Sequence, residues 1–249
     1  FGYDDTLLKE RRHPLRGDLD QVSTRHPVYV FHMSGHVVCT NSYLIEKAGL
    51  TGSEPQPLGG RYLKDENGRP NGVFEEPDGF AMVGLSFPQP PADMVPDIIL
   101  KGSENYLAAG VTTAQDGAAA PQVLPALQLA HEKGTLRVRV QILPYYPYPL
   151  DQYPTTVSGT PLTDDGMISL GAFKIHNDGS IQCYTAYLTT PYYRPHPTQP
   201  KEYLYRGYPF FRDEDLNALV LDRHKEGWQI AIHGNGDAAI DQIIQAFRE

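Results

Sequence analysis

The residues with the clearest chemical potential lie in two apolar runs in the second half of the chain. Residues 229–232 form the first run, and His233 with a glycine-rich turn follows it directly. Residues 172–175 form the second run, and Lys174 stands inside it. Imidazole nitrogens bind metals and act as general bases, and a lysine in apolar surroundings is paired, neutral or chemically altered. Both patterns predict a site beside buried strands.

Three interpretations of His233 are open from the residues alone. His233 is a metal ligand or general base at the carboxyl end of a strand, where α/β folds place their chemistry. Alternatively, residues 234–239, Gly-Asn-Gly-Asp-Ala-Ala, form the turn of a dinucleotide-binding oxidoreductase. That fold needs an acidic residue at the end of the next strand, and the sequence reaches Glu249 before any such strand. The plainer alternative is a buried histidine bonded to a backbone carbonyl.

Lys174 and the residues after it allow several roles. Strand alternation places Phe173 and Ile175 on one face and Lys174 on the other. A buried Lys174 would form a salt bridge, a Schiff base, or a carbamate that ligates metal, whereas a lysine at the strand edge would extend to solvent. His176 shares the face of Lys174 or lies in the following loop. Asp178 is the candidate catalytic residue, as a contact to substrate or to a ligand, or else part of a plain turn.

Helices and strands that alternate from residue 97 onward must position these side chains. Expected helices cover 97–109, 121–133 and a segment capped by Asp213, and expected strands cover 111–116, 136–142, a run from Ile168, and 229–232. This alternation predicts a parallel sheet, in which a closed barrel and an open sheet give the same pattern. Polar residues stand at the end of each strand, at Gln115, Asp116, Gln141, Lys174, His176, Asp178, His233 and Asp237.

The first part of the chain has a different organisation. Residues 1–96 lack alternating strand and helix units, so they predict a small α+β subdomain or insertion, with residues 97–249 as the second domain. A short helix capped by Asn41 or Ser42 is expected, and residues 65–68 predict a hairpin turn. His32 and His36 are four apart on an expected strand, which is not the spacing of a metal pair, so packing or a substrate contact is expected.

Composition excludes several classes of function. The chain has 249 residues and a formal net charge of −9, which argues against a nucleic-acid partner. No apolar run is long enough to cross a bilayer, so no membrane partner is expected. Cys39 and Cys183 lack metal-type spacing and predict two ordinary thiols in a reducing, cytoplasmic compartment. The chain does not begin with Met, so we expect that its true N-terminus is missing.

Motifs along nearly the whole chain resemble one family. They are 173–180, Phe-Lys-Ile-His-Asn-Asp-Gly-Ser, and 232–239, with Thr185-Ala186, Pro191-Tyr192, Gly35-His36, Asn41-Ser42, Gly59-Gly60, 68–73 and 110–116. In this order the motifs are similar to those of the amidohydrolase superfamily, in its YtcJ-like branch, which includes N-substituted formamide deformylase. The resemblance implies a metal-dependent (β/α)8 barrel, of which this chain carries strands two to five with an insertion at residues 1–96.

The resemblance also implies a site. Lys174 matches the strand-four position that is a carboxylated lysine in many members, and His233 matches the strand-five metal ligand. The implied cofactor is a divalent metal, one or two ions of the zinc type. The implied activity is hydrolysis of an amide-like, non-peptide C–N bond in a small-molecule substrate by metal-activated water. A non-catalytic binding or regulatory protein on the same scaffold is the alternative.

The departures from the family pattern concern the other ligands. The His-x-His pair of strand one, the histidine of strand six and the aspartate of strand eight have no counterpart here, so the chain is expected to be a central fragment. Lys174 and His233 are two ligands where a catalytic zinc needs three, so weak metal binding and no activity are expected of the chain alone. Open sheet edges predict poor solubility or association into a homo-oligomer.

Overall fold

The computed structural model describes residues 2–57, 59–84, 86, 90–196 and 204–249. These residues divide into two compact units, each assembled from three segments. Unit 1 comprises Phe1–Pro88, Asn177–Asp213 and Gly234–Ile244, and unit 2 comprises Gln89–His176, Glu214–His233 and Gln245–Glu249. A division at residue 96 stays a prediction about domains.

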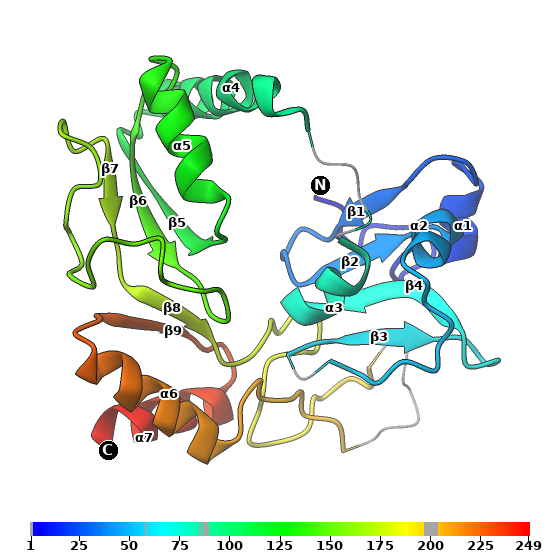
Figure 1. Ribbon diagram of the computed structural model, residues 1–249. Coiled ribbons are helices and arrows are strands. Elements are labelled where there is room, and N and C mark those ends of the chain that lie inside the picture. Colours follow the sequence, from blue (N-terminus) through cyan, green and yellow to red (C-terminus); the bar gives the residue numbers. More distant parts are fainter. Residues whose placement is uncertain (1, 58, 85, 87–89, 197–203) are drawn as a thin grey trace. The chain divides into compact units, whose positions relative to one another are not determined.

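Unit 1 is built on a four-stranded antiparallel sheet with the strand order β1-β2-β4-β3 (Figure 1). Its strands are β1 (Tyr29–Phe31), β2 (Val37–Thr40), β3 (Arg61–Lys64) and β4 (Pro70–Glu75). Its helices are α1 (Arg16–Asp20), α2 (Ser42–Lys47) and α3 (Glu76–Gly84). The mixed helix and strand content expected for this part of the chain is therefore present.

The central strands β2 and β4 are buried along their whole length, because both faces of the sheet are covered. One face packs in a cluster formed by Leu19, Val37, Cys39, Leu63, Val73 and Cys183. The other face packs in a cluster formed by Ile45, Tyr62, Phe74 and Val83. The two cysteines are free thiols in the first cluster, and burial raises the pKa of each to about 12. They are therefore protonated near neutral pH.

Local sequence features explain the boundaries of the short elements in unit 1. The side chain of Asn41 caps α2 by accepting a hydrogen bond from the backbone N–H of Leu44. Gly49 then ends the helix with a φ of 72°. Gly68, with a φ of 76°, closes the turn between β3 and β4. The cap and the turn expected from the sequence are both observed.

Unit 2 contains parallel strands that alternate with helices. The elements are η1 (Ala92–Met94), α4 (Val95–Ala108), β5 (Thr113–Ala119), α5 (Val123–Glu132), β6 (Arg139–Pro144), β7 (Ile168–Leu170), β8 (Phe173–His176), α6 (Asp213–Lys225), β9 (Ile230–His233) and α7 (Asp237–Arg248), with α6 and α7 each shared with unit 1. The strands form a β5-β6-β7 sheet and a β8-β9 pair, and α4 packs beside α5 (Figure 1). The α/β character is confirmed, and closure into a (β/α)8 barrel stays a prediction.

The strand expected from Ile168 onward is two strands. Gly171 lies between β7 and β8, and a Cβ there would stand 2.5 Å from Leu143 Cδ1. The backbone N–H of Gly171 donates to the carbonyl of Ile142 at 2.7 Å. A glycine allows this close approach, and the strand is interrupted there: β7 pairs with β6, and β8 pairs with β9.

No helix among the described residues is long and apolar enough to cross a membrane. The longest is α4, which has 14 residues, and a helix needs about 20 to span the hydrocarbon core.

Candidate active site

His176 and His233 lie side by side at the carboxyl ends of two parallel strands. Strands β8 and β9 pair with Lys174 opposite Ala231 and His176 opposite His233. The two imidazole rings have their centroids 4.9 Å apart and their planes inclined by 57°. His233 therefore ends a strand, as expected. His176 lies on the neighbouring strand and not in the loop after it.

Lys174 shares a face with both histidines. Along β8, Phe173 and Ile175 are buried while Lys174 and His176 are half-buried, as the alternation predicted. Burial lowers the pKa of Lys174, and no carboxylate contributes to that shift. Among the described residues the shift thus comes from burial and not from a charged partner, and the amine of Lys174 is neutral more often than that of an exposed lysine.

An aromatic side chain of unit 2 lies beside this face. Tyr145 forms a parallel bridge with Lys174, and its ring lies edge-on to His176 with a centroid distance of 5.0 Å. Two imidazoles on a single face fit a zinc-type cation, for which histidine nitrogen is a usual ligand.

The carboxylate of Asp178 is fully buried and holds backbone amides of unit 1. Its Oδ2 accepts hydrogen bonds from Tyr187 N at 2.9 Å and Gly236 N at 2.8 Å, and its Oδ1 accepts one from Asn235 N at 2.9 Å. Asn235 Nδ2 also donates to the carbonyl of Gly179 at 2.8 Å. Asp178 therefore fixes the turn that follows His233 in the chain.

Close packing within the chain surrounds both glycines of that turn, and at Gly236 the neighbouring atoms are backbone atoms. A Cβ on Gly236 would stand 1.8 Å from the carbonyl oxygen of Tyr187, and a Cβ on Gly234 would stand 2.6 Å from Ile243 Cδ1. In a dinucleotide-binding turn the backbone N–H groups bind a pyrophosphate. Here the N–H groups of Asn235 and Gly236 already bind the Asp178 carboxylate. This arrangement argues against the oxidoreductase interpretation.

Sequence reasoning missed a buried ion pair between His36 and Glu76. His36 Nδ1 lies 2.8 Å from Glu76 Oε2, and the Glu76 side chain is 1% exposed. Burial alone lowers the pKa of His36, but the hydrogen bond and charge of Glu76 outweigh it and raise the pKa overall. Burial likewise raises the pKa of Glu76, against the opposing effect of His36.

Glu76 is also strained and closely packed. Its φ of 63° lies in the left-handed region that non-glycine residues rarely adopt. A Cβ on Gly179 would stand 2.0 Å from Glu76 Oε1 and 2.1 Å from Thr185 Oγ1. The carboxyl group of Glu76 is therefore packed against the turn that begins at Asp178, and no sequence motif marked it.

His32 is a buried packing histidine, which is one of the two roles expected for it. Its Nδ1 accepts the N–H of Ser34 at 3.2 Å, so the neutral ring carries its proton on Nε2, which lies 3.1 Å from Asp5 Oδ1. Asp4, Asp5 and His32 bring possible ligand atoms within 4.8 Å of one another. A metal would need the Nε2 lone pair and thus the opposite tautomer, so this cluster fits an internal hydrogen bond better than a metal.

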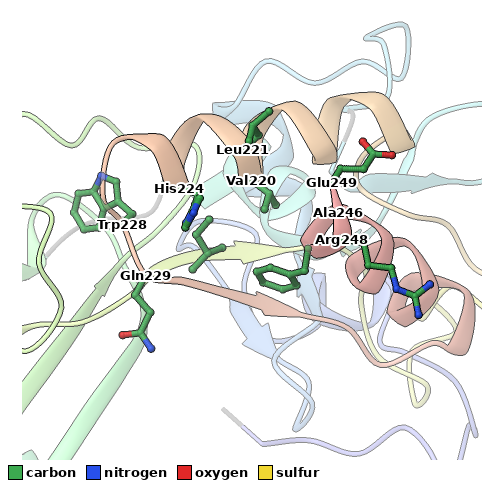
Figure 2. Close-up of a pocket in the computed structure, with 10 residues that line it drawn as sticks. Val220, Leu221, His224, Trp228, Gln229, Ala246, Arg248 and Glu249 are labelled. Carbon is green, nitrogen blue, oxygen red and sulfur yellow. The ribbon is translucent and has the colours of Figure 1, made fainter.

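A cavity of about 600 Å³ lies in unit 2 between α6, β9 and the end of α7 (Figure 2). Its lining includes Val220, Trp228, Ile230 and Phe247. Ile230 alternates with Ala231 and thus points to the face of β9 opposite His233. The cavity is therefore separate from the Lys174, His176 and His233 face.

The sequence matches the family model described as "Amidohydrolase family" over residues 1–249. It is 23% identical over 276 residues to putative amidohydrolase YtcJ of Bacillus subtilis (strain 168), covering 100% of this chain and 45% of YtcJ. It is 22% identical over 253 residues to N-substituted formamide deformylase of Arthrobacter pascens, covering 96% of this chain and 44% of the relative. The chain thus spans less than half the length of these relatives.

The fold is also found in a solved structure. An uncharacterized metal-dependent hydrolase from Pyrococcus horikoshii OT3 aligns with a TM-score of 0.64 and 22% identity, covering 99% of this chain and 46% of the other. A match at this identity establishes a shared fold.

Proposed function

Because the chain belongs to the amidohydrolase family, we propose that the protein it represents is a metal-dependent hydrolase that cleaves an amide-like, non-peptide C–N bond in a small molecule. The observation that carries this proposal is the placement of Lys174 and His233 on one face of the β8-β9 pair, at and near the carboxyl ends of parallel strands. That edge is where parallel α/β folds hold their catalytic groups.

In this proposal Lys174 and His233 hold a divalent cation of the zinc type. A bound cation of this kind polarises a carbonyl oxygen and lowers the pKa of a water molecule, which makes hydrolysis feasible at neutral pH. His233 contributes a neutral imidazole nitrogen, which is the commonest protein ligand for such metals.

Lys174 would take part as a carbamate. Because burial lowers its pKa, the amine more often carries the lone pair that attacks carbon dioxide. A bond forms between Nζ and the carbon, one C–O bond order is lost, and a proton leaves the nitrogen for water. The resulting anion has two oxygens that can ligate a metal, which an ammonium group cannot.

Asp178, predicted as a catalytic residue, has a different proposed role. Its buried carboxylate binds three backbone N–H groups of the chain. We therefore assign it the role of a positioning residue that holds the turn after His233. The charge on its two oxygens is satisfied within the protein, which leaves the substrate to be bound by other groups.

The test uses the full-length parent protein, its Lys174→Ala and His233→Ala variants, and His224→Ala as a matched control on the exposed end of α6. Bound metal is measured by elemental analysis, and hydrolysis is assayed with a panel of amides that includes N-substituted formamides, the class named for one relative. Metal and activity lost in the first two variants and kept in the third would support the proposal. Absence of metal in the parent after reconstitution would favour a non-catalytic binding protein on the same scaffold.

A further inference from the structure

We propose that His176 is a metal ligand of this protein, acting with His233 and Lys174 to bind one zinc-type cation. This inference rests on the proposed function, because it concerns the metal of the same site. It adds a ligand that the sequence alone did not assign.

The register of β8 and β9 brings the two imidazoles together. Paired strands lie about 4.8 Å apart, so His176 and His233, which are directly opposite each other, project from one face at that separation. The centroid distance of 4.9 Å agrees with this spacing. Zinc–nitrogen bonds are about 2.0–2.1 Å long, so two imidazoles held this close together could both be ligands of one ion.

The position of Lys174 completes a set of three donors. Residues 174 and 176 are two apart on β8 and therefore share a face. Lys174 stands one strand alternation before His176 and opposite Ala231, the neighbour of Ile232 before His233, so a carbamate on Lys174 would be a third donor on this face. Three protein ligands are the number that catalytic zinc sites use, with a further position open.

The aromatic neighbour of His176 supports a defined ring orientation. The Tyr145 ring stands edge-on to His176 at 5.0 Å with an interplanar angle of 78°. A ring restricted by such packing on one side and by His233 on the other loses little freedom on binding a metal. The alternative role of His176 is aromatic packing alone, and this role predicts that metal affinity is independent of the imidazole.

The experiment is a calorimetric titration of Zn²⁺ into the 249-residue chain in bicarbonate buffer. The variants are His176→Ala, His176→Asn, His233→Ala and the control His224→Ala, which is exposed at the end of α6. We expect one ion per chain, affinity at least tenfold weaker in each variant of His176 and His233, and wild-type affinity in the control. Imidazole ¹⁵N spectra should show Zn²⁺-dependent shifts at His176 and His233 together.

Each outcome separates this inference from the proposed function. Loss of binding in His233→Ala with unchanged binding in both His176 variants would overturn the role of His176 and leave the hydrolase proposal intact. No Zn²⁺ binding by the wild-type chain would overturn the three-ligand site. Binding that needs both histidines, in a parent protein that hydrolyses no amide, would support the inference while the hydrolase proposal fails. His176→Asn, checked by circular dichroism, keeps the test valid if the alanine variant unfolds.

Discussion

The carboxylate of Asp178 accepts a hydrogen bond from the backbone N–H of Asn235 at 2.9 Å, although 57 positions separate the two residues. With the bonds from Tyr187 and Gly236, it ties three N–H groups from two backbone segments of unit 1 to one buried charge. Hydrogen bonds to an ionised acceptor are about twice as strong as neutral ones, and leaving a buried donor without an acceptor is costly. The turn after His233 therefore depends on a charge that lies far away in the sequence.

Asp178→Asn should destabilise the fold by about 2–3 kcal/mol, the cost of leaving a buried donor unsatisfied. Both carboxylate oxygens accept backbone N–H groups, so whichever position the new NH₂ group takes, it faces another donor. Urea unfolding followed by circular dichroism measures the change. The exposed Asp222→Asn on α6 is the matched control and should remain within about 0.5 kcal/mol of wild type. A stable Asp178→Asn protein would contradict the anchoring role.

Gly236→Ala and Gly102→Ala should have opposite effects. The new methyl group at position 236 would stand 1.8 Å from the Tyr187 carbonyl oxygen, so the backbone must shift, at a cost of about 2 kcal/mol or more. At position 102, inside α4, nothing lies within 4 Å of the added carbon. Alanine there should stabilise the protein by up to about 1 kcal/mol. Thermal unfolding measures the stability of the two variants against the wild type. Equal changes in stability would contradict the close packing at Gly236.

Lys174→Met should stabilise the metal-free protein while abolishing the proposed activity. Burial lowers the pKa of Lys174, so the folded state binds its proton less tightly than the unfolded state does. The wild-type free energy of unfolding should therefore rise with pH between the folded pKa and the unfolded value of about 10.4. Methionine removes this dependence and should add about 0.5–2 kcal/mol at neutral pH. A loss of stability in chelator-treated, carbon dioxide-free buffer would indicate an ion pair at Lys174.

The His36 imidazole should titrate at a lower pH in Glu76→Gln than in the wild type. Burial lowers the pKa of His36, Glu76 raises it more strongly, and Asp178 adds a smaller attraction. A folded pKa above the unfolded value of about 6.5 gives stability that is fully present below pH 6.5 and lost as the pH rises through the folded pKa. Nuclear magnetic resonance titration of the ring protons measures the shift, with exposed His224 as the control. An unchanged His36 pKa in Glu76→Gln would contradict the ion pair.

Local patterns in the sequence predicted the elements well and the long-range contacts poorly. Asn41 and Gly49 mark the ends of α2 by cap chemistry that depends only on neighbouring residues. Lys174 was placed on the correct strand and face because alternation is also local. The interruption at Gly171 was missed, because the pairing of β7 with β6 and of β8 with β9 depends on strands that are distant in the sequence.

The candidate site shows the same limit. His176 lies two residues after Lys174, so the period of a strand already placed both on one face, but only the register with β9 reveals that His233 is its neighbour. The link between His36 and Glu76 spans 40 positions and joins a turn to the first residue of a helix. Pairings of this kind come from tertiary packing and have no period in the sequence.

The Asp178 anchor has a consequence for ligand recognition. Its three hydrogen bonds exist within the protein itself, so the turn after His233 has a defined backbone conformation before any ligand arrives. Ordering one backbone residue costs about 1–2 kcal/mol of conformational entropy, and that cost is met during folding. At the proposed site, ligand binding beside this turn would therefore begin from a preorganised backbone, which favours selection among ligands by fit over adaptation to each of them.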